Sequence, residues 1–193
     1  MPDEPRATPE PCGQDALAHE QREGDLDDRV PQGRDPSVAL LAVDLGLRAG
    51  LAGFSRTGQL VFCRSTHFPS PARMKVAIPG ILAHYPALQR LALEGDANLA
   101  RLWRQAAERR GIRVHQLPAE VWRQGTLLPR EQRRGDDAKR AALVRARQII
   151  KDAGLSPPKT LRHDAAEAVL LGLFVARAEL TRATSTRRHS GGG

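Results

Sequence analysis

Short apolar runs separated by turn signals dominate the middle of the chain. Residues 38–43 form a continuous apolar run, which is typical of a buried central strand. Apolar segments follow at residues 50–54 and 59–64, with a Ser-Arg-Thr-Gly turn signal between them. The pattern predicts three consecutive strands, most simply an antiparallel meander.

Beyond this meander, the pattern alternates strands with helices. It predicts strands over 88–93 and 112–117, and helices over 72–84, 98–110, 119–124, 136–153 and 164–180. Pro79 and Gly80 are expected to kink or shorten the first helix, and Gly111 to end the second. A basic loop is expected over 127–135, followed by Asp136 as a helix cap. The order predicts an α/β fold, a five-stranded mixed sheet with helices on both faces.

The two ends of the chain differ from this middle part. Residues 1–36 are rich in Pro, Gly and charged side chains and lack apolar clusters, so we expect a disordered acidic N-terminal extension. Residues 181–193 read as a flexible basic tail. The sequence therefore predicts one folded domain over 37–180, a length that suits a single core.

Charge is divided unevenly along the 193 residues. The net charge is +8, yet residues 1–37 hold ten acidic and four basic residues, which leaves +14 on the remainder. Arginine spread over a basic domain is the footprint of phosphate-backbone binding. An arginine-rich solvated surface would look similar, so charge alone does not separate the two readings.

Other compositional features set the expected environment. No run of apolar residues is long enough to span a membrane, and no signal-peptide pattern opens the chain. Cys12 lies in the N-terminal extension, so a structural disulfide with Cys63 is not expected. A reducing, cytoplasmic location is the expectation.

Scarce acidic residues follow two of the predicted strands. Asp44 ends the first strand, where Gly46 and Gly50 allow close backbone approach, and Glu94 ends the fourth. Ligand sites in open α/β sheets lie beyond the carboxyl ends of strands. Each acid also has a local explanation. Asp44 would end the strand and accept a hydrogen bond from a turn amide, and Glu94 would be a solvated acid where the strand ends. Asp96 is close enough to Glu94 to help at such a site, but it is equally well explained as the N-cap of the next helix.

Two further acids, Asp164 and Glu167, open the last helix. Their three-residue spacing places both carboxylates on one helix face, as a metal site requires. The alternative is a capping box, in which Asp164 caps the helix and Glu167 returns to the cap amide. Capping explains this pair, but it does not explain Asp44 and Glu94.

Two basic residues are additional candidates. His163 adjoins Asp164, which suits a metal ligand, a general base or a proton shuttle. Lys139 follows the basic loop, from which it would contact a phosphate near the metal ions. For both, a solvated surface role is the alternative.

Together these motifs resemble the RuvC-like Holliday junction resolvases of the RNase H-like superfamily. The resemblance rests on AVDLGLRAG, ALEG and HDAAEA, and covers about residues 38–180. Family members carry an acid on the first strand, a Glu on the fourth and an acid pair on the last helix. These positions fall on Asp44, Glu94, Asp164 and Glu167, and a basic residue of the family falls on Lys139. The chain departs from many relatives by having Glu167 in place of Asp and Leu45 in place of Pro.

The resemblance implies an RNase H-like fold and a Mg²⁺-dependent endonuclease that cleaves branched DNA, above all Holliday junctions. It implies two Mg²⁺ or Mn²⁺ ions per active site, held by Asp44, Glu94, Asp164 and Glu167, and phosphodiester hydrolysis between them. It also implies a homodimer, because symmetric nicking of a junction needs two sites related by a twofold axis.

Three rival interpretations remain open. The YqgF-like branch of the same fold, linked to ribosomal RNA processing, shares the first motif but does not call for a Glu such as Glu94. Sugar-kinase and actin-like phosphotransferases share an Asp-x-Gly strand but need two related domains, for which this chain is too short. The third is a non-catalytic nucleic-acid-binding module of the same fold, against which the four acids argue.

Overall fold

The computed structural model describes residues 35–127 and 135–189, without the side chains of residues 135–136 and 182–189. The predicted N-terminal extension and the 127–135 loop therefore lie almost wholly outside the described residues, as do the side chain of Asp136 and the last four residues of the predicted tail. None of the described helices combines the length and apolar character needed to cross a membrane.

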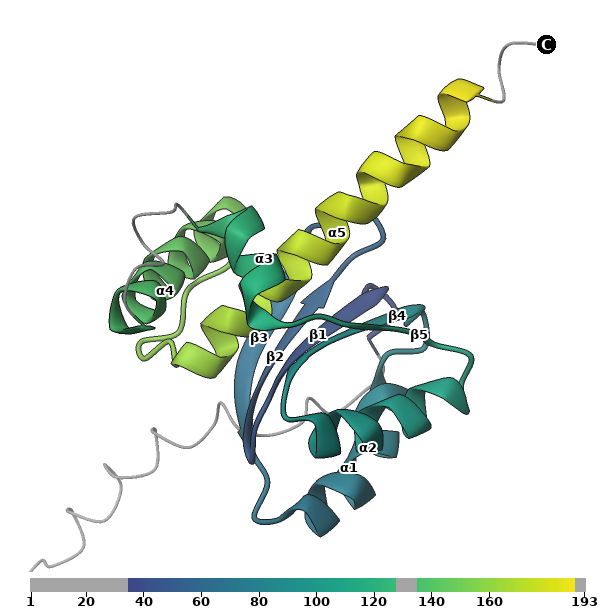
Figure 1. The fold of residues 1–193 in the computed structure, drawn as a ribbon, viewed down its shortest axis with the longest axis vertical. Helices are drawn as coiled ribbons and strands as arrows, with labels where there is room; N and C mark the ends of the chain where they lie inside the picture. The colour runs from purple at the N-terminus through teal and green to yellow at the C-terminus, as the bar shows by residue number, and fades with distance from the viewer. Residues whose placement is uncertain (1–34, 128–134, 190–193) are drawn as a thin grey trace, which may run out of the picture.

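Five strands form one mixed sheet in the order β3-β2-β1-β4-β5 (Figure 1). The first three pair antiparallel, as the meander prediction required, while β4 and β5 add in parallel beside β1. The bounds are β1 Leu40–Leu45, β2 Arg48–Phe54, β3 Leu60–His67, β4 Arg90–Gly95 and β5 Arg113–Gln116. The most apolar run of the chain thus becomes the central strand β1.

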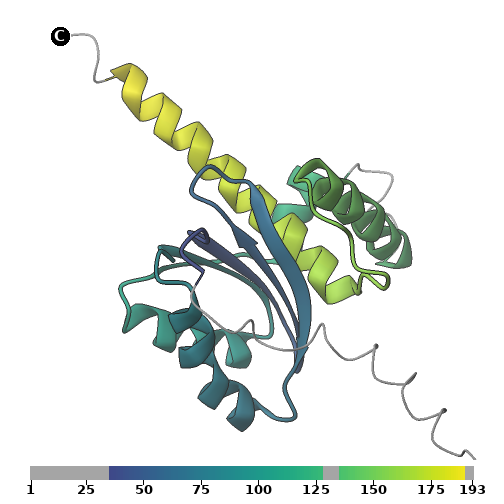
Figure 2. The ribbon, with the colours of Figure 1, turned by 180° about the vertical axis from the view of Figure 1, so that it is seen from behind.

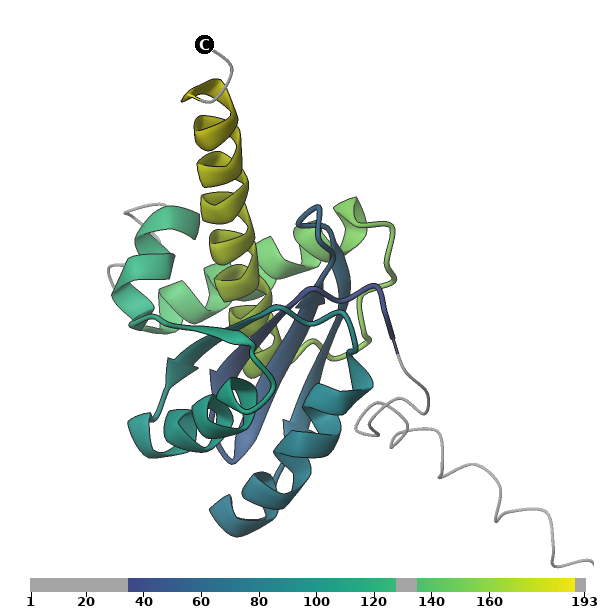
Figure 3. The same ribbon diagram turned by 90° about the vertical axis from the view of Figure 1, so that its right-hand side faces the viewer.

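Helices cover both faces of this sheet, as predicted (Figures 1 and 3). One face carries α1 (Pro71–His84) and α2 (Ala97–Glu108). The other carries α3 (Ala119–Thr126), α4 (Gly135–Asp152) and α5 (His163–His189). Alternate residues of β1 supply the two cores: Leu41 and Val43 face α1 and α2, and Leu40 and Ala42 face α5. Figure 2 shows the antiparallel β2–β3 hairpin from behind, with α5 beyond it.

The expected shortening of the first helix is wrong, because α1 runs from Pro71 to His84 and passes through Pro79. The missing N–H of Pro79 leaves the carbonyl of Lys75 without its helical partner. Both residues are exposed, so water can hydrate that carbonyl at little cost. Four residues on the opposite side of the helix (Met74, Ile78, Ile81 and Leu82) are buried and hold α1 against the sheet.

The last helix also differs from its predicted length. Helix α5 continues past Leu180 to His189, so the expected helix end at Leu180 is wrong. Its first half packs across β1, β2 and β3, while the later turns project beyond the sheet (Figure 1). The packed half therefore positions the acids at the start of the helix.

Candidate active site

Four residues form a row across the sheet at the level of Asp44. Strand register places Ser65 opposite Gly50, Gly50 opposite Asp44, and Asp44 opposite Glu94. Side chains that share a register level point to the same face of a sheet. This row therefore brings the first two predicted acids side by side, on the face that α5 covers.

Gly50 allows α5 to approach this row closely. A Cβ atom at Gly50 would lie 1.9 Å from the carbonyl oxygen of Asp164 and 2.7 Å from the amide nitrogen of Ala165. No side chain fits in that space, so the start of the helix rests directly on the β2 backbone. The close backbone approach expected near Asp44 is thus made by α5, and it carries Asp164 to the row of Asp44 and Glu94.

The two acids of α5 are held by side chains from other elements. The Ser65 hydroxyl donates to Asp164 Oδ2 at 2.6 Å, and Arg123 Nη2 donates to Glu167 Oε1 at 2.7 Å. The helix already begins at His163, so Asp164 lies inside its first turn and not at the cap position. The capping-box alternative is therefore wrong, and both carboxylates are engaged in tertiary contacts. Asp96 does act as a cap, since its Oδ1 accepts from the amides of Asn98 and Leu99.

Burial and mutual repulsion make the site strongly unfavourable for negative charge. Burial, then the charge of Glu167, a hydrogen bond to Glu94 and the charges of Glu94 and Asp164 raise the pKa of Asp44 to about 9. Burial likewise raises the pKa of Glu94, against the hydrogen bond from Asp44 and the nearby positive charge of Arg123. Asp44 and Glu94 thus behave as a coupled carboxyl pair that shares a proton.

These acids suit a hard divalent cation by their chemistry. Mg²⁺ and Mn²⁺ take carboxylate oxygens, and a cation beside Asp44 would offset the repulsion that raises its pKa. As they stand, no three Asp, Glu, His or Cys side chains among the described residues are arranged to hold an ion. Their oxygens have other partners: Asp44 and Glu94 bond to each other, Asp164 to Ser65 and Glu167 to Arg123. A bound ion would take up oxygens that these contacts now use.

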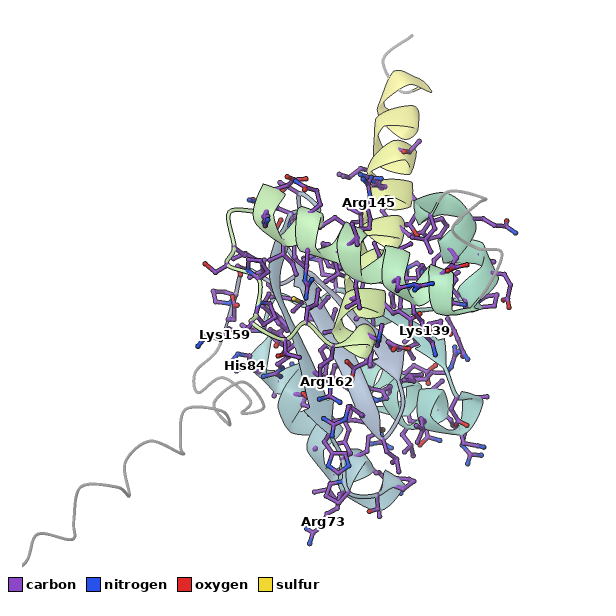
Figure 4. The ribbon with its side chains drawn as sticks, turned by 90° about the vertical axis from the view of Figure 1, so that its left-hand side faces the viewer. Arg73, His84, Lys139, Arg145, Lys159 and Arg162 are labelled. Carbon is purple, nitrogen blue, oxygen red and sulfur yellow. The ribbon has the colours of Figure 1, made fainter. Side chains whose placement is uncertain are left out.

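The two basic candidates lie at the surface. His163 is the first residue of α5 and Lys139 lies in the first turns of α4, and both are exposed. Neither makes a hydrogen bond or ion pair with the four acids in the described part of the chain. Figure 4 views the side of the molecule that bears Lys139, with Lys159 and Arg162 in the connection between α4 and α5.

Sequence reasoning missed two residues of this site. Ser65 lies in a strand with no acidic neighbour, and only its register with Gly50 reveals its place. Arg123 belongs to the short helix that follows β5. The chain has thirty Lys and Arg residues, and nothing in the sequence around Arg123 sets it apart from the others. Neither residue carries a local signal, because the contact of each is with the distant start of α5.

A separate cavity of about 700 Å³ lies at the opposite end of the sheet. Its lining comes from the β2–β3 turn, the starts of β4 and β5, and the later turns of α5, and includes Arg56, Arg90, Arg113 and Glu179. Arg90 and Glu179 form an ion pair of 2.9 Å there. None of the four predicted acids lines this cavity, so it is distinct from the candidate site.

The fold has solved counterparts. The structure of T. thermophilus RuvC in complex with a Holliday junction substrate matches with a TM-score of 0.53 and 16% identity, covering 73% of this chain and 94% of that one. This chain has the RuvC-like fold. The yeast mitochondrial Holliday junction resolvase Ydc2 matches with a TM-score of 0.46 and 10% identity, over 82% of this chain and 88% of that one. No protein-family model matches the chain, and no curated protein matches it in sequence.

Within the RuvC-like fold, the site has a simple architecture. Two neighbouring parallel strands present Asp44 and Glu94, and a helix that crosses them presents Asp164 and Glu167. The RNase H-like fold expected from the sequence is therefore confirmed.

Proposed function

We propose that this protein is a metal-dependent endonuclease that cleaves branched DNA, above all Holliday junctions. The observation that carries the proposal is the meeting of Asp44, Glu94 and the start of α5 at one level of a RuvC-like sheet. The neighbouring structure of this fold holds a Holliday junction substrate, which favours the same class of substrate here.

The four acids would hold two Mg²⁺ or Mn²⁺ ions. When bound, such ions activate a water molecule and stabilise the leaving oxygen of a phosphodiester. Asp44 is placed to contribute most, because it lies between Glu94 on one side and Gly50, beneath the α5 backbone, on the other. Ser65 would orient the Asp164 carboxylate through its hydrogen bond, as residues behind metal ligands do.

Exposed basic residues near the start of α5 would contact the DNA backbone. Lys139, Lys159 and Arg162 are exposed on one side of the molecule (Figure 4). Arg162 directly precedes the helix that carries Asp164 and Glu167. Phosphate contacts of this kind set the register of a substrate without reading its sequence. His163 would extend the same surface beside the acids.

Cleavage of a four-way junction further requires two sites. A twofold-related pair of active sites nicks two strands symmetrically, so we propose that the protein acts as a homodimer. Sedimentation of the protein alone and with a junction would measure this assembly.

The proposal is tested by incubating the protein with four-way junctions, flaps, linear duplex and structured RNA in Mg²⁺ or Mn²⁺. We expect the protein to cleave junctions faster than linear duplex. We also expect cleavage to be lost in EDTA and in the Asp44→Asn variant. If none of these substrates is cleaved in a metal-dependent way, the proposed enzymatic function is wrong. A nucleic-acid-binding module of the same fold then remains as the interpretation. Cleavage of RNA alone would assign the chain to the YqgF-like alternative, a reading that Glu94 argues against.

A further inference from the structure

Arg123 places a permanent positive charge at the edge of the candidate metal site. Its Nη2 donates to Glu167 Oε1 at 2.7 Å, and the Glu167 side chain is only 14% exposed. The Arg123 charge also acts on Glu94, whose pKa it lowers. A guanidinium presents its charge as a planar set of N–H donors that matches a carboxylate. Arg123 thus stands where it competes with a metal ion for two of the four acids.

The packing around Arg123 anchors its backbone and supports its guanidinium. Its guanidinium lies over the ring of Trp122, 5.1 Å from the centroid, and Trp122 is fully buried. Helix α3 packs against α5 so tightly that a Cβ at Gly125 would lie 2.6 Å from the Phe174 ring. The backbone of α3 is therefore anchored, while the Arg123 side chain keeps 31% of its surface exposed. This exposure is what would let the head group turn toward another anion while the helix stays in place.

We propose that Arg123 couples metal binding to substrate binding, an inference that rests on the proposed function. We call the exchange of Arg123 between Glu167 and a substrate phosphate the latch. In the free protein Arg123 pairs with Glu167 and withholds that carboxylate from the metal ions. A substrate phosphate offers Arg123 an alternative partner that can accept two parallel hydrogen bonds. Transfer of Arg123 to the phosphate releases Glu167 for the ions, so each ligand strengthens the binding of the other.

This coupling predicts a specific result for Arg123→Gln, which removes the charge. Without DNA, the variant binds Mn²⁺ about 10-fold more tightly than the original protein, because Glu167 and Glu94 lose a competing cation. Isothermal titration of the free protein with Mn²⁺ measures this affinity. Arg123→Lys retains the charge and is expected to bind Mn²⁺ as the original protein does.

The second measurement is the junction affinity by fluorescence anisotropy, in EDTA and in Ca²⁺. By thermodynamic reciprocity, the original protein gains junction affinity with the metal, and the latch contributes about 10-fold to that gain. Arg123→Gln loses this contribution. The matched control is Arg104→Gln on α2, whose Nη2 bonds to Gln116 Oε1 at 2.6 Å on the other face of the sheet. It should leave both the Mn²⁺ affinity and the metal-dependent gain unchanged.

The outcomes separate the latch from the function on which it rests. Mn²⁺ binding that Asp44→Asn abolishes but Arg123→Gln leaves unchanged overturns the latch alone. Equal tightening by Arg123→Gln and Arg123→Lys also overturns it, since that pattern indicates a packing effect. Mn²⁺ binding that Asp44→Asn leaves untouched overturns the proposed metal site itself.

Discussion

Asp44 on β1 and Glu94 on β4 lie directly beside each other in a parallel strand pair, and a hydrogen bond joins their carboxyl groups. Two carboxylates on directly paired residues repel each other, so the pair keeps a proton unless a cation replaces it. The residues are fifty positions apart in sequence, and the strand register alone brings them together. This relationship generates the first two predictions.

The first prediction concerns the stability of the metal-free protein against pH. The pKa of Asp44 rises from its ordinary value of 3.8 to about 9 in the fold, so between these values the folded state binds a proton that the unfolded chain releases. The free energy of unfolding must therefore fall as the pH rises from about 4 to about 9. Urea denaturation in EDTA across this range measures the slope.

Asp44→Asn is the control for this slope. The amide does not ionise, so the variant should show a flatter pH profile and, near neutral pH, a gain of about 1–4 kcal/mol in the free energy of unfolding. Added Mg²⁺ should stabilise the original protein and not the variant. A pH profile that is equally steep in both proteins would contradict the assignment of the raised pKa to Asp44.

The second prediction separates two neighbouring acids. Glu94→Gln should reduce the rate of junction cleavage about 100-fold or more, because it removes a proposed metal ligand. Asp96→Asn should cleave normally, since asparagine caps a helix about as well as aspartate and Asp96 caps α2. Single-turnover cleavage rates compare the two variants. Equal losses in both would show that the effect is structural.

A third prediction tests the contact between β2 and α5. Gly50→Ala would force a methyl group to within 1.9 Å of the Asp164 carbonyl oxygen, so α5 must shift away from the sheet. We expect a loss of about 3 kcal/mol in the free energy of unfolding, at the upper end for overpacking, together with loss of cleavage. Thermal and urea unfolding provide the measurement.

Gly80→Ala is the matched control for Gly50→Ala. Beyond its chain neighbours and the backbone of its own helix, no atom lies within 4 Å of a Cβ at this position, so alanine should stabilise α1 by about 0.5–1 kcal/mol. If both substitutions have the same effect, the close approach of α5 to Gly50 is not what makes the glycine necessary.

The fourth prediction concerns Ser65, which donates to Asp164 at 2.6 Å. Ser65→Ala leaves this carboxylate without its orienting donor, so the cleavage rate should fall about 10-fold and the Mg²⁺ requirement should rise. Metal titrations of the cleavage rate separate the two effects. Ser55→Ala, in the turn between β2 and β3, should change neither value, because the Ser55 hydroxyl bonds only within the turn, to Thr57 and Gln59, among the described residues.

The sequence by itself determined the elements and the positions of the acids along them. Apolar runs with turn signals predicted all five strands, and the order of strands and helices predicted the mixed sheet. These features can be predicted because the alternation of apolar and polar residues and the turn residues depend on consecutive positions in the chain. The same reasoning located Asp44 and Glu94 at strand ends, where the structure has them.

Only the tertiary structure decided which of these groups meet. Locally, Asp164 and Glu167 read equally well as a capping box, and the ambiguity ends with Ser65 and Arg123, which hold them from other elements. The passage of α1 through Pro79 likewise depended on which side of the helix faces water. Strand register and the approach of α5 to Gly50 arise from packing between distant segments. Residues with no acidic neighbour in sequence therefore became part of the site through packing alone.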